Sequence, residues 1–277
     1  MQKSTKTKLL IVNADDFGKD NDVNEAVLEA HKNGILTTAS LMVNEDGATK
    51  ALIIAKENKT LGVGLHLSLL FDKPALNKTQ IPDLVGNDGK FHNSPVKTGF
   101  NCYFKKRLRR QLELEISAQV KKFQNTGLPL DHLNGHLHFH MQPVVFNIIM
   151  ENAEQWGIKA IRLTRDPLSL NLKLSKERIL GKICEATTFG LLSAWCRRKL
   201  EKKNIKFADQ VFGLLQNGHV DPQYLINLIK ILPSGITEIY SHPSKKNAVH
   251  EFKALIDTEA KNRVCENQIK LVRYQDI

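Results

Sequence analysis

The chain has 277 residues, a formal net charge of +11 and four cysteines that form no CxxC pair. A chain of this length can bury a full core, and we expect residues 1–277 to form a single domain. The cysteine spacing argues against a disulfide framework or a cysteine zinc knuckle. No apolar run approaches the ~20 residues that span a bilayer, and no secretory signal precedes the first strand, so we expect a cytoplasmic protein.

Apolar, β-branched segments alternate with helical patterns along the chain. Such alternation predicts an α/β protein with parallel strands covered by helices, as in a barrel or a doubly wound sheet. The predicted strands are residues 8–14, 37–43, 61–67, 131–135, 160–163 and 237–241. The predicted helices are residues 23–33, 48–57, 109–126, 143–156, 176–189 and 222–232.

One long stretch, residues 71–104, breaks this alternation. It carries three prolines and three glycines and has little periodicity. A long irregular insertion in a compact domain is usually a lid, a binding loop or a disordered segment. Because it directly follows the predicted strand that contains His66, we predict a loop that caps the site.

Two adjacent carboxylates, Asp15 and Asp16, follow the first predicted strand. In α/β proteins ligands bind at the carboxyl ends of strands, where buried carboxylates are costly without a cation or a proton. Adjacent side chains point in different directions, so one aspartate can hold a metal ion while the other faces a water. The alternative is an Asx-turn or a helix N-cap, in which this segment only turns the chain.

Histidines lie at the ends of further predicted strands. His66 ends the strand 61–67, and four of the ten histidines lie within residues 132–140. On a strand, His136, His138 and His140 would share one face, which a hydrophobic core does not favour. Imidazole and carboxylate groups together suit a divalent cation, and two imidazoles favour zinc or another late transition ion. The sequence leaves open whether His138 or His140 contributes to the site.

A further histidine, His242, follows the last predicted strand and precedes a proline. A metal ion held by one aspartate and two histidines keeps positions open for water and substrate, and it lowers the pKa of its water from ~15.7 towards ~7. The second aspartate could then act as a general base, and His242 could give a proton to a leaving group. These residue types together indicate a metal-dependent hydrolase.

The positive charge is concentrated in residues 101–122, with seven basic and two acidic residues, and in residues 195–206, with six and one. Such segments suit an anionic surface, either nucleic acid or the inner leaflet of a membrane, or else they are solvated helix faces. No nucleic-acid-binding motif accompanies the charge, so we expect no nucleic acid partner. Residues 189–203 mix apolar and basic side chains. They predict an interfacial amphipathic helix, or a helix that packs on the barrel or on the second subunit of a homodimer.

Four motifs together resemble the YdjC-like carbohydrate deacetylases, the family of chitooligosaccharide deacetylase. They are residues 11–18 (IVNADDFG), residues 64–66 (GLH), the histidine block 132–140 and residues 240–243 (YSHP). They span nearly the full chain in the order of the family. Residues 109–112, 126–132 and 211–214 are similar to the branch of the family that is associated with hopanoid biosynthesis.

This resemblance implies a deformed (β/α) TIM-like barrel and metal-dependent removal of the acetyl group from an N-acetylated amino sugar. It implies Asp16, His66 and His136 as ligands of one divalent cation, magnesium in most descriptions of the family. It also implies Asp15 as the catalytic base and His242 as the catalytic acid. In the hopanoid branch, the implied substrate is an N-acetylglucosaminyl glycolipid rather than a short oligosaccharide.

The chain departs from the chitooligosaccharide deacetylases at two places. Leu133-Asn134-Gly135 stands where those enzymes tend to have Leu-Asp-Ser, and Leu137 replaces a further histidine after His136. Neither departure removes an implied ligand, but both argue against chito-oligomers as the substrate.

Two other functions remain open at the level of the sequence. A metal-dependent phosphoesterase would keep the metal ion and change the substrate, although such enzymes more often use two metal ions and more carboxylates. A non-catalytic protein could bind a glycolipid or a membrane surface through its basic segments, which would make it peripheral at the inner membrane.

Overall fold

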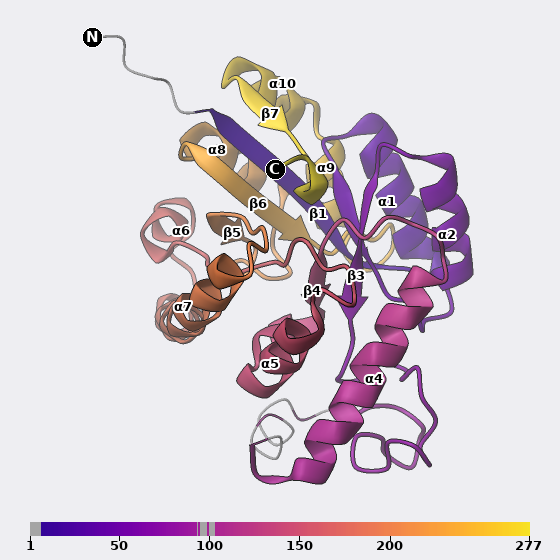
Figure 1. Cartoon of the computed structure of the whole chain (residues 1–277). Helices are drawn as coiled ribbons and strands as arrows, with labels where there is room; N and C mark the ends of the chain where they lie inside the picture. Colours follow the sequence, from indigo (N-terminus) through magenta and orange to yellow (C-terminus); the bar gives the residue numbers. More distant parts are fainter. Residues whose placement is uncertain (1–6, 93, 95–98, 100–102) are drawn as a thin grey trace.

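The computed structural model describes residues 7–92, 94, 99 and 103–277 (Figure 1). Its strands form a parallel seven-stranded sheet in the order β4-β3-β2-β1-β6-β5, and β7 pairs with the start of β1. Parallel strands need crossover helices, which explains the alternation seen in the sequence. The strands are β1 (Lys8–Phe17), β2 (Thr38–Leu41), β3 (Gly62–Leu67), β4 (Leu133–Gly135), β5 (Gln210–Phe212), β6 (Gly235–Ser241) and β7 (Ile269–Leu271).

The predicted strand 160–163 is shorter than expected. It is reduced to two isolated bridges, in which Ile161 pairs with Leu133 and Ala160 pairs with Lys206. These bridges connect β4 to the segment before β5, so the sheet curls into a deformed, TIM-like (β/α) barrel. Arg162 follows the bridges, and its side chain is fully buried in the barrel.

Helices surround the sheet; in Figure 1, α1 and α2 lie on one side of it and α6 and α7 on the other. Several begin at sequence-encoded caps: the Asp20 and Asp221 side chains accept hydrogen bonds from the first turns of α1 and α8, and Pro143 occupies the first turn of α5. The helices are α1 (Asn21–Asn33), α2 (Ala48–Glu57), α4 (Lys106–Gln124), α5 (Pro143–Asn152), α6 (Leu168–Leu174), α7 (Ile179–Lys202), α8 (Pro222–Ile231), α9 (Val249–Ile256) and α10 (Thr258–Glu266).

The helix predicted over 176–189 is present with other bounds: α7 begins at Ile179 and continues to Lys202, because Ser193, Cys196 and Leu200 are buried against the barrel beyond Gly190. The histidine block does not continue the strand predicted over 131–135 but forms a 3₁₀ helix, η1 (His136–Met141), with left-handed backbone at Leu137 and His138. Its histidines therefore do not share one face.

The insertion predicted over 71–104 is irregular where it is described, and its residues 93, 95–98 and 100–102 lie outside the described residues. The described part packs on α4: the Glu115 carboxylate accepts hydrogen bonds from the backbone N–H groups of Ala75 and Leu76. Phe71, at its start, lies edge-on to the His136 ring. That the insertion caps the site stays a prediction.

Within the described part of the chain, no helix combines the length and the apolar character needed to cross a membrane.

Candidate active site

The five residues predicted for the site lie together at the carboxyl ends of the strands. Asp15 and Asp16 come from the end of β1 and His66 from β3, while His136 follows β4 and His242 follows β6. These strands belong to one parallel sheet, so their carboxyl ends lie at the edge where α/β proteins bind ligands.

Asp16 lies between two imidazoles. The His66 Nε2 and His136 Nδ1 atoms are 3.4 Å and 3.6 Å from its Oδ1 atom, and the three candidate ligand atoms all lie within 4.8 Å of one another. The second oxygen of Asp16, Oδ2, pairs with the Lys19 ammonium at 2.9 Å. Oδ1 is thereby left facing the two histidines.

Two atoms of this cluster are buried without a hydrogen-bond partner among the described residues, Asp16 Oδ1 and His66 Nε2. A buried polar atom without a partner costs about 1–3 kcal/mol, so such atoms call for an explanation. The Nδ1 atom of His66 lies 2.8 Å from the Asn134 Oδ1 acceptor, so Nδ1 carries the proton and Nε2 presents a lone pair. Burial also lowers the pKa of His66, which keeps its imidazole neutral. The donor set therefore fits a divalent cation.

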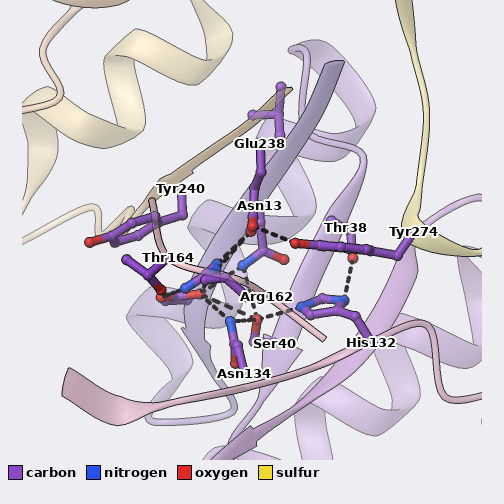
Figure 2. A network of polar contacts seen from close by, with 12 residues as sticks. Asn13, Thr38, Ser40, His132, Asn134, Arg162, Thr164, Glu238, Tyr240 and Tyr274 are labelled. Atoms are coloured by element: carbon purple, nitrogen blue, oxygen red, sulfur yellow. Dashed lines mark hydrogen bonds and ion pairs between the residues drawn. The ribbon is translucent and has the colours of Figure 1, made fainter. Parts of the chain in front are cut away.

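Asp15 has the opposite surroundings, because its carboxylate is saturated with hydrogen bonds from a polar network. Figure 2 labels the members Asn13, Ser40, Asn134 and Arg162 of this network. The Oδ1 atom of Asp15 accepts hydrogen bonds from Asn13, Ser40, Asn134 and Arg162. Its Oδ2 atom accepts one from Arg162 Nη1 at 2.6 Å. Burial by itself would raise the pKa of Asp15, but the guanidinium holds it far below its ordinary value. Asp15 is thus ionised, and Oδ2 is its less occupied oxygen.

Arg162 was missed at the level of the sequence, where it is one basic residue in an apolar run. It is fully buried, and its guanidinium also donates to Glu238 Oε1, at 2.7 Å and 2.9 Å. The Tyr240 ring covers it at 4.4 Å, and the Tyr274 hydroxyl donates to the other oxygen of Glu238 at 2.5 Å. One cation therefore pairs with two buried carboxylates, and its supporting contacts come from three distant segments of the chain.

His242 lies on the other side of Asp15, with its Nε2 atom 4.0 Å from Asp15 Oδ2. The backbone N–H of His242 donates to Glu251 Oε2 at 2.5 Å, and the imidazole Nδ1 is 3.7 Å from the same oxygen. Burial acts to lower the pKa of His242, but Glu251 and the two aspartates raise it to about 9. The imidazole therefore carries a proton at neutral pH, unlike that of His66.

His138 and His140 lie outside the cluster of Asp16, His66 and His136. His138 is held between the Tyr240 and Thr164 hydroxyls, at 2.8 Å and 3.2 Å, and burial lowers its pKa well below the ordinary value. His140 Nε2 donates to the Arg162 carbonyl oxygen, and burial lowers its pKa to about 3. Both are neutral side chains that pack around the site.

A pocket of about 260 Å³ opens over these groups. It is lined by Asp15, His66, His136 and His242, and also by residues of α7 and of the segment that follows β5. The backbone around it is unusual: of seven non-glycine residues with positive φ in the described chain, five border the site. They are Asp16, Phe71, Leu137, His138 and Arg178.

The family model of the YdjC-like proteins matches residues 9–266. The chain belongs to the YdjC-like family. This confirms the family part of the resemblance, whereas the assignment to the hopanoid branch stays a prediction.

Two curated relatives of this YdjC-like chain are named carbohydrate deacetylase. The one from Brevibacillus brevis is 37% identical over 149 residues, which are 54% of this chain and 57% of the relative. The one from Thermoanaerobacter pseudethanolicus is 29% identical over 279 residues, 96% of this chain and 98% of the relative. The alignment thus spans little more than half of the first relative and nearly all of the second.

A solved structure from Enterococcus faecalis V583, named for a proposed cleavage of cellobiose phosphate, has the same fold. Its TM-score is 0.75 at 21% identity, and the alignment covers 98% of each chain. At this identity the likeness concerns the fold, and it supports the deformed barrel derived from the strand order.

Proposed function

We propose that this YdjC-like protein is a metal-dependent hydrolase that removes the acetyl group from an N-acetylated amino sugar. The observation that carries the proposal is the cluster of Asp16, His66 and His136, with two unpartnered buried atoms, at one end of a pocket that Asp15 and His242 also line. The names of the relatives, carbohydrate deacetylase, agree with it.

Asp16, His66 and His136 would hold one divalent cation. When bound, such an ion polarises an oxygen of the substrate and makes water more acidic. The family resemblance favours magnesium, whereas two imidazole ligands favour zinc or another late transition ion. Among the described residues there is one cluster of this kind. A two-metal phosphoesterase is therefore the weaker alternative.

Asp15 would accept the proton of the attacking water at Oδ2. Its other oxygen already accepts four hydrogen bonds, whereas Oδ2 accepts one, and Asp15 lines the pocket. Arg162 makes Asp15 a weak base but fixes its position and keeps it ionised. A weak base suffices when the water has itself become more acidic.

His242 would donate a proton to the departing amine. It carries that proton at neutral pH because the Glu251 carboxylate lies beside it, and its Nε2 atom faces the pocket side of Asp15. An ionised carboxylate and a protonated imidazole 4.0 Å apart form the base and acid pair that amide hydrolysis needs. The products would be acetate and a free amino sugar.

The finer substrate proposal is an N-acetylglucosaminyl glycolipid of the hopanoid type, rather than a short oligosaccharide. The solvent-exposed face of α7 supports it, because Leu180 and Leu191 are 84% and 72% exposed there and Arg198 and Lys202 follow on the same face. An apolar and basic helix face of this kind suits peripheral contact with an anionic membrane. The cytoplasmic location and a homodimer stay predictions.

The first test is mass spectrometry of purified, metal-loaded protein with N,N′-diacetylchitobiose and with an N-acetylglucosaminyl glycolipid. We expect the mass loss that replacement of acetyl by hydrogen produces. In Asp15→Asn, turnover should fall by about 10²–10⁴-fold at unchanged metal content, since the base is lost and the cluster around Asp16 is kept. Asp46→Asn, an exposed aspartate, is the control.

Deacetylation of neither substrate would overturn the proposal, and wild-type turnover in Asp15→Asn would remove Asp15 from the mechanism. Membrane contact is tested separately by flotation with vesicles that contain anionic lipid. Leu180→Ser and Leu191→Ser together should weaken it, whereas equal flotation of the variant would exclude α7 as the contact.

A further inference from the structure

The first half of α7 contributes one wall of the pocket that His66 and His136 also line. Arg178, at its N-cap, and Glu185 and Phe189 line the pocket. Their spacings of seven and four residues place them on one face of the helix. Lys182 and Ser193, both buried, continue the same face. The exposed face with Leu180 and Leu191 is therefore a different surface.

This wall is fixed to the barrel at several points. The Ser193 hydroxyl donates to the Thr164 carbonyl oxygen at 2.6 Å. The Lys182 ammonium donates to the Ser175 carbonyl oxygen at 3.0 Å and to Gln216 Oε1 at 3.2 Å. The second of these contacts connects α7 to the segment that contributes Leu214 and Asn217 to the same pocket. A rigid wall of this kind can select a substrate by shape and hydrogen bonding.

The polar groups of the wall are arranged around Glu185. Arg178 Nη2 donates to Glu185 Oε1 at 3.0 Å, which fixes the carboxylate. The other oxygen, Oε2, is covered and has no hydrogen-bond partner among the described residues. Next to it along the helix, the Phe189 ring meets the His138 ring edge-to-face, with 5.6 Å between centroids.

We propose that this wall is the sugar-recognition subsite of the enzyme, with the carboxylate of Glu185, whose side chain is 32% exposed, as acceptor of a hydrogen bond from a sugar hydroxyl. Phe189 supplies the apolar surface for the C–H face of the same ring. Arg178 is a positioning residue that acts through Glu185. The inference rests on the deacetylase proposed above and adds which side chains select the sugar.

The charges of the wall favour a neutral sugar over a phosphorylated one. The Arg178 guanidinium is already paired with Glu185, and the Lys182 ammonium is buried with its own acceptors. A phosphate group here would face a carboxylate that accepts hydrogen bonds but cannot donate them. A hydroxyl group, in contrast, is a donor that the Glu185 carboxylate can accept. A simple amide without a sugar ring would leave Glu185 and Phe189 unused.

Glu185→Gln tests the proposal because it converts the acceptor into an amide donor at nearly constant size. With the N-acetylglucosaminyl glycolipid we expect KM to rise about 10-fold or more, the effect of losing a hydrogen bond to a charged group, and kcat to change less than about twofold. Glu201→Gln is the matched control, since Glu201 lies on the same helix in an exposed ion pair with Arg197. Its KM should equal that of the wild type.

Monodeoxy analogues of N-acetylglucosamine identify the hydroxyl. One analogue should raise the KM of the wild type as much as Glu185→Gln does with the parent sugar. The same analogue should bring no further rise in the variant, because both changes remove one interaction. Phe189→Leu should weaken all analogues alike. Additive effects of Glu185→Gln with every analogue, or identical KM values for Glu185→Gln and Glu201→Gln, would overturn the proposal.

A turnover-independent measurement separates this inference from the proposed function. Calorimetric titration of wild type and Glu185→Gln with N-acetylglucosamine reports on the wall alone. Tighter binding by the wild type would support the subsite even if no acetate were released. Release of acetate with equal sugar affinity in the two proteins would support the deacetylase and reject the subsite.

Discussion

Asp15 and Asp16 are neighbours in the chain but lie in contrasting regions. The carboxylate of Asp15 sits in a network in which five hydrogen bonds reach its two oxygens. The carboxylate of Asp16 directs one oxygen at two imidazoles that do not satisfy it. A left-handed backbone at Asp16, with φ of 63°, turns the two side chains apart.

The difference assigns different tasks to the two regions. A saturated network is rigid and keeps its carboxylate ionised, as a base that must be held in place requires. A region with unpartnered acceptors is incomplete without a cation. Substitutions in the hydrogen-bond network around Asp15 should therefore alter the stability of the protein together with its turnover. Substitutions in the cluster of Asp16, His66 and His136 should alter metal binding and leave the stability of the metal-free protein largely unchanged.

The largest expected effect comes from Arg162→Met. It leaves the buried carboxylates of Asp15 and Glu238 without their shared cation, which should lower the free energy of unfolding by about 3–5 kcal/mol. Urea denaturation of the metal-free protein at pH 7 measures this. Arg197→Met, which removes an exposed ion pair with Glu201, should cost less than about 1 kcal/mol. Similar stability of the two variants would contradict the assignment.

The variant Asp16→Asn tests the second region, the cluster of Asp16, His66 and His136. Asparagine tolerates the left-handed backbone, so the free energy of unfolding of the metal-free protein should change by less than about 1 kcal/mol. Metal at 100 times its Kd should stabilise the wild type by about 2.7 kcal/mol and the variant much less. Elemental analysis and urea denaturation with and without metal measure the two effects. Equal stabilisation of both proteins would place the ligands elsewhere.

A smaller effect is expected from Glu251→Gln, which alters the acid and not the base. His242 must be protonated to act as the acid, and it loses that proton as the pH rises through about 9. Removing the Glu251 charge lowers this pKa, so the alkaline limb of the kcat profile should move down by about one pH unit. An unchanged alkaline limb would exclude His242 as the group that titrates there.

The smallest expected effect is that of Tyr274→Phe. The ring and its stacking on His132 remain, but Glu238 Oε2 loses its hydroxyl donor. The free energy of unfolding should fall by about 1–2 kcal/mol at unchanged metal content. Urea denaturation measures the change, with the exposed Tyr103→Phe as control. A variant as stable as the wild type would mean that the Asp15 network does not extend to Tyr274.

The sequence allowed the fold class and the convergence of five site residues to be predicted, because in an α/β chain the end of a strand can be recognised where an apolar run gives way to polar residues. Asp15, His66 and His242 each follow an apolar run, and parallel pairing brings such positions together. The family model matches residues 9–266, a range that contains these positions. The strand alternation left a barrel and a doubly wound sheet open, and the family resemblance implied the barrel; β5 and β7 are too short to give a pattern of their own.

The network behind Asp15 could not be predicted, since it depends on pairs far apart in the chain. Arg162 lies 147 residues from Asp15 and 76 residues from Glu238. In the sequence, Arg162 and Glu238 each stand inside an apolar run. This position indicates that the charged side chain is buried, but it does not identify the residue with which it pairs. The conformation of the histidine block could not be predicted for another reason. Its alternating spacing is typical of a strand, whereas left-handed residues after Gly135 turn the chain into η1.

The positive φ values around the site have a consequence for protein engineering. A non-glycine residue in left-handed backbone costs about 1–2 kcal/mol, and Asp16, Leu137, His138 and Arg178 all lie there at one pocket. Glycine at Asp16 would relieve that cost and remove a buried charge, yet it would abolish a candidate metal ligand. Searches for heat-resistant variants should therefore select such replacements repeatedly and return inactive protein, unless the screen also demands catalysis.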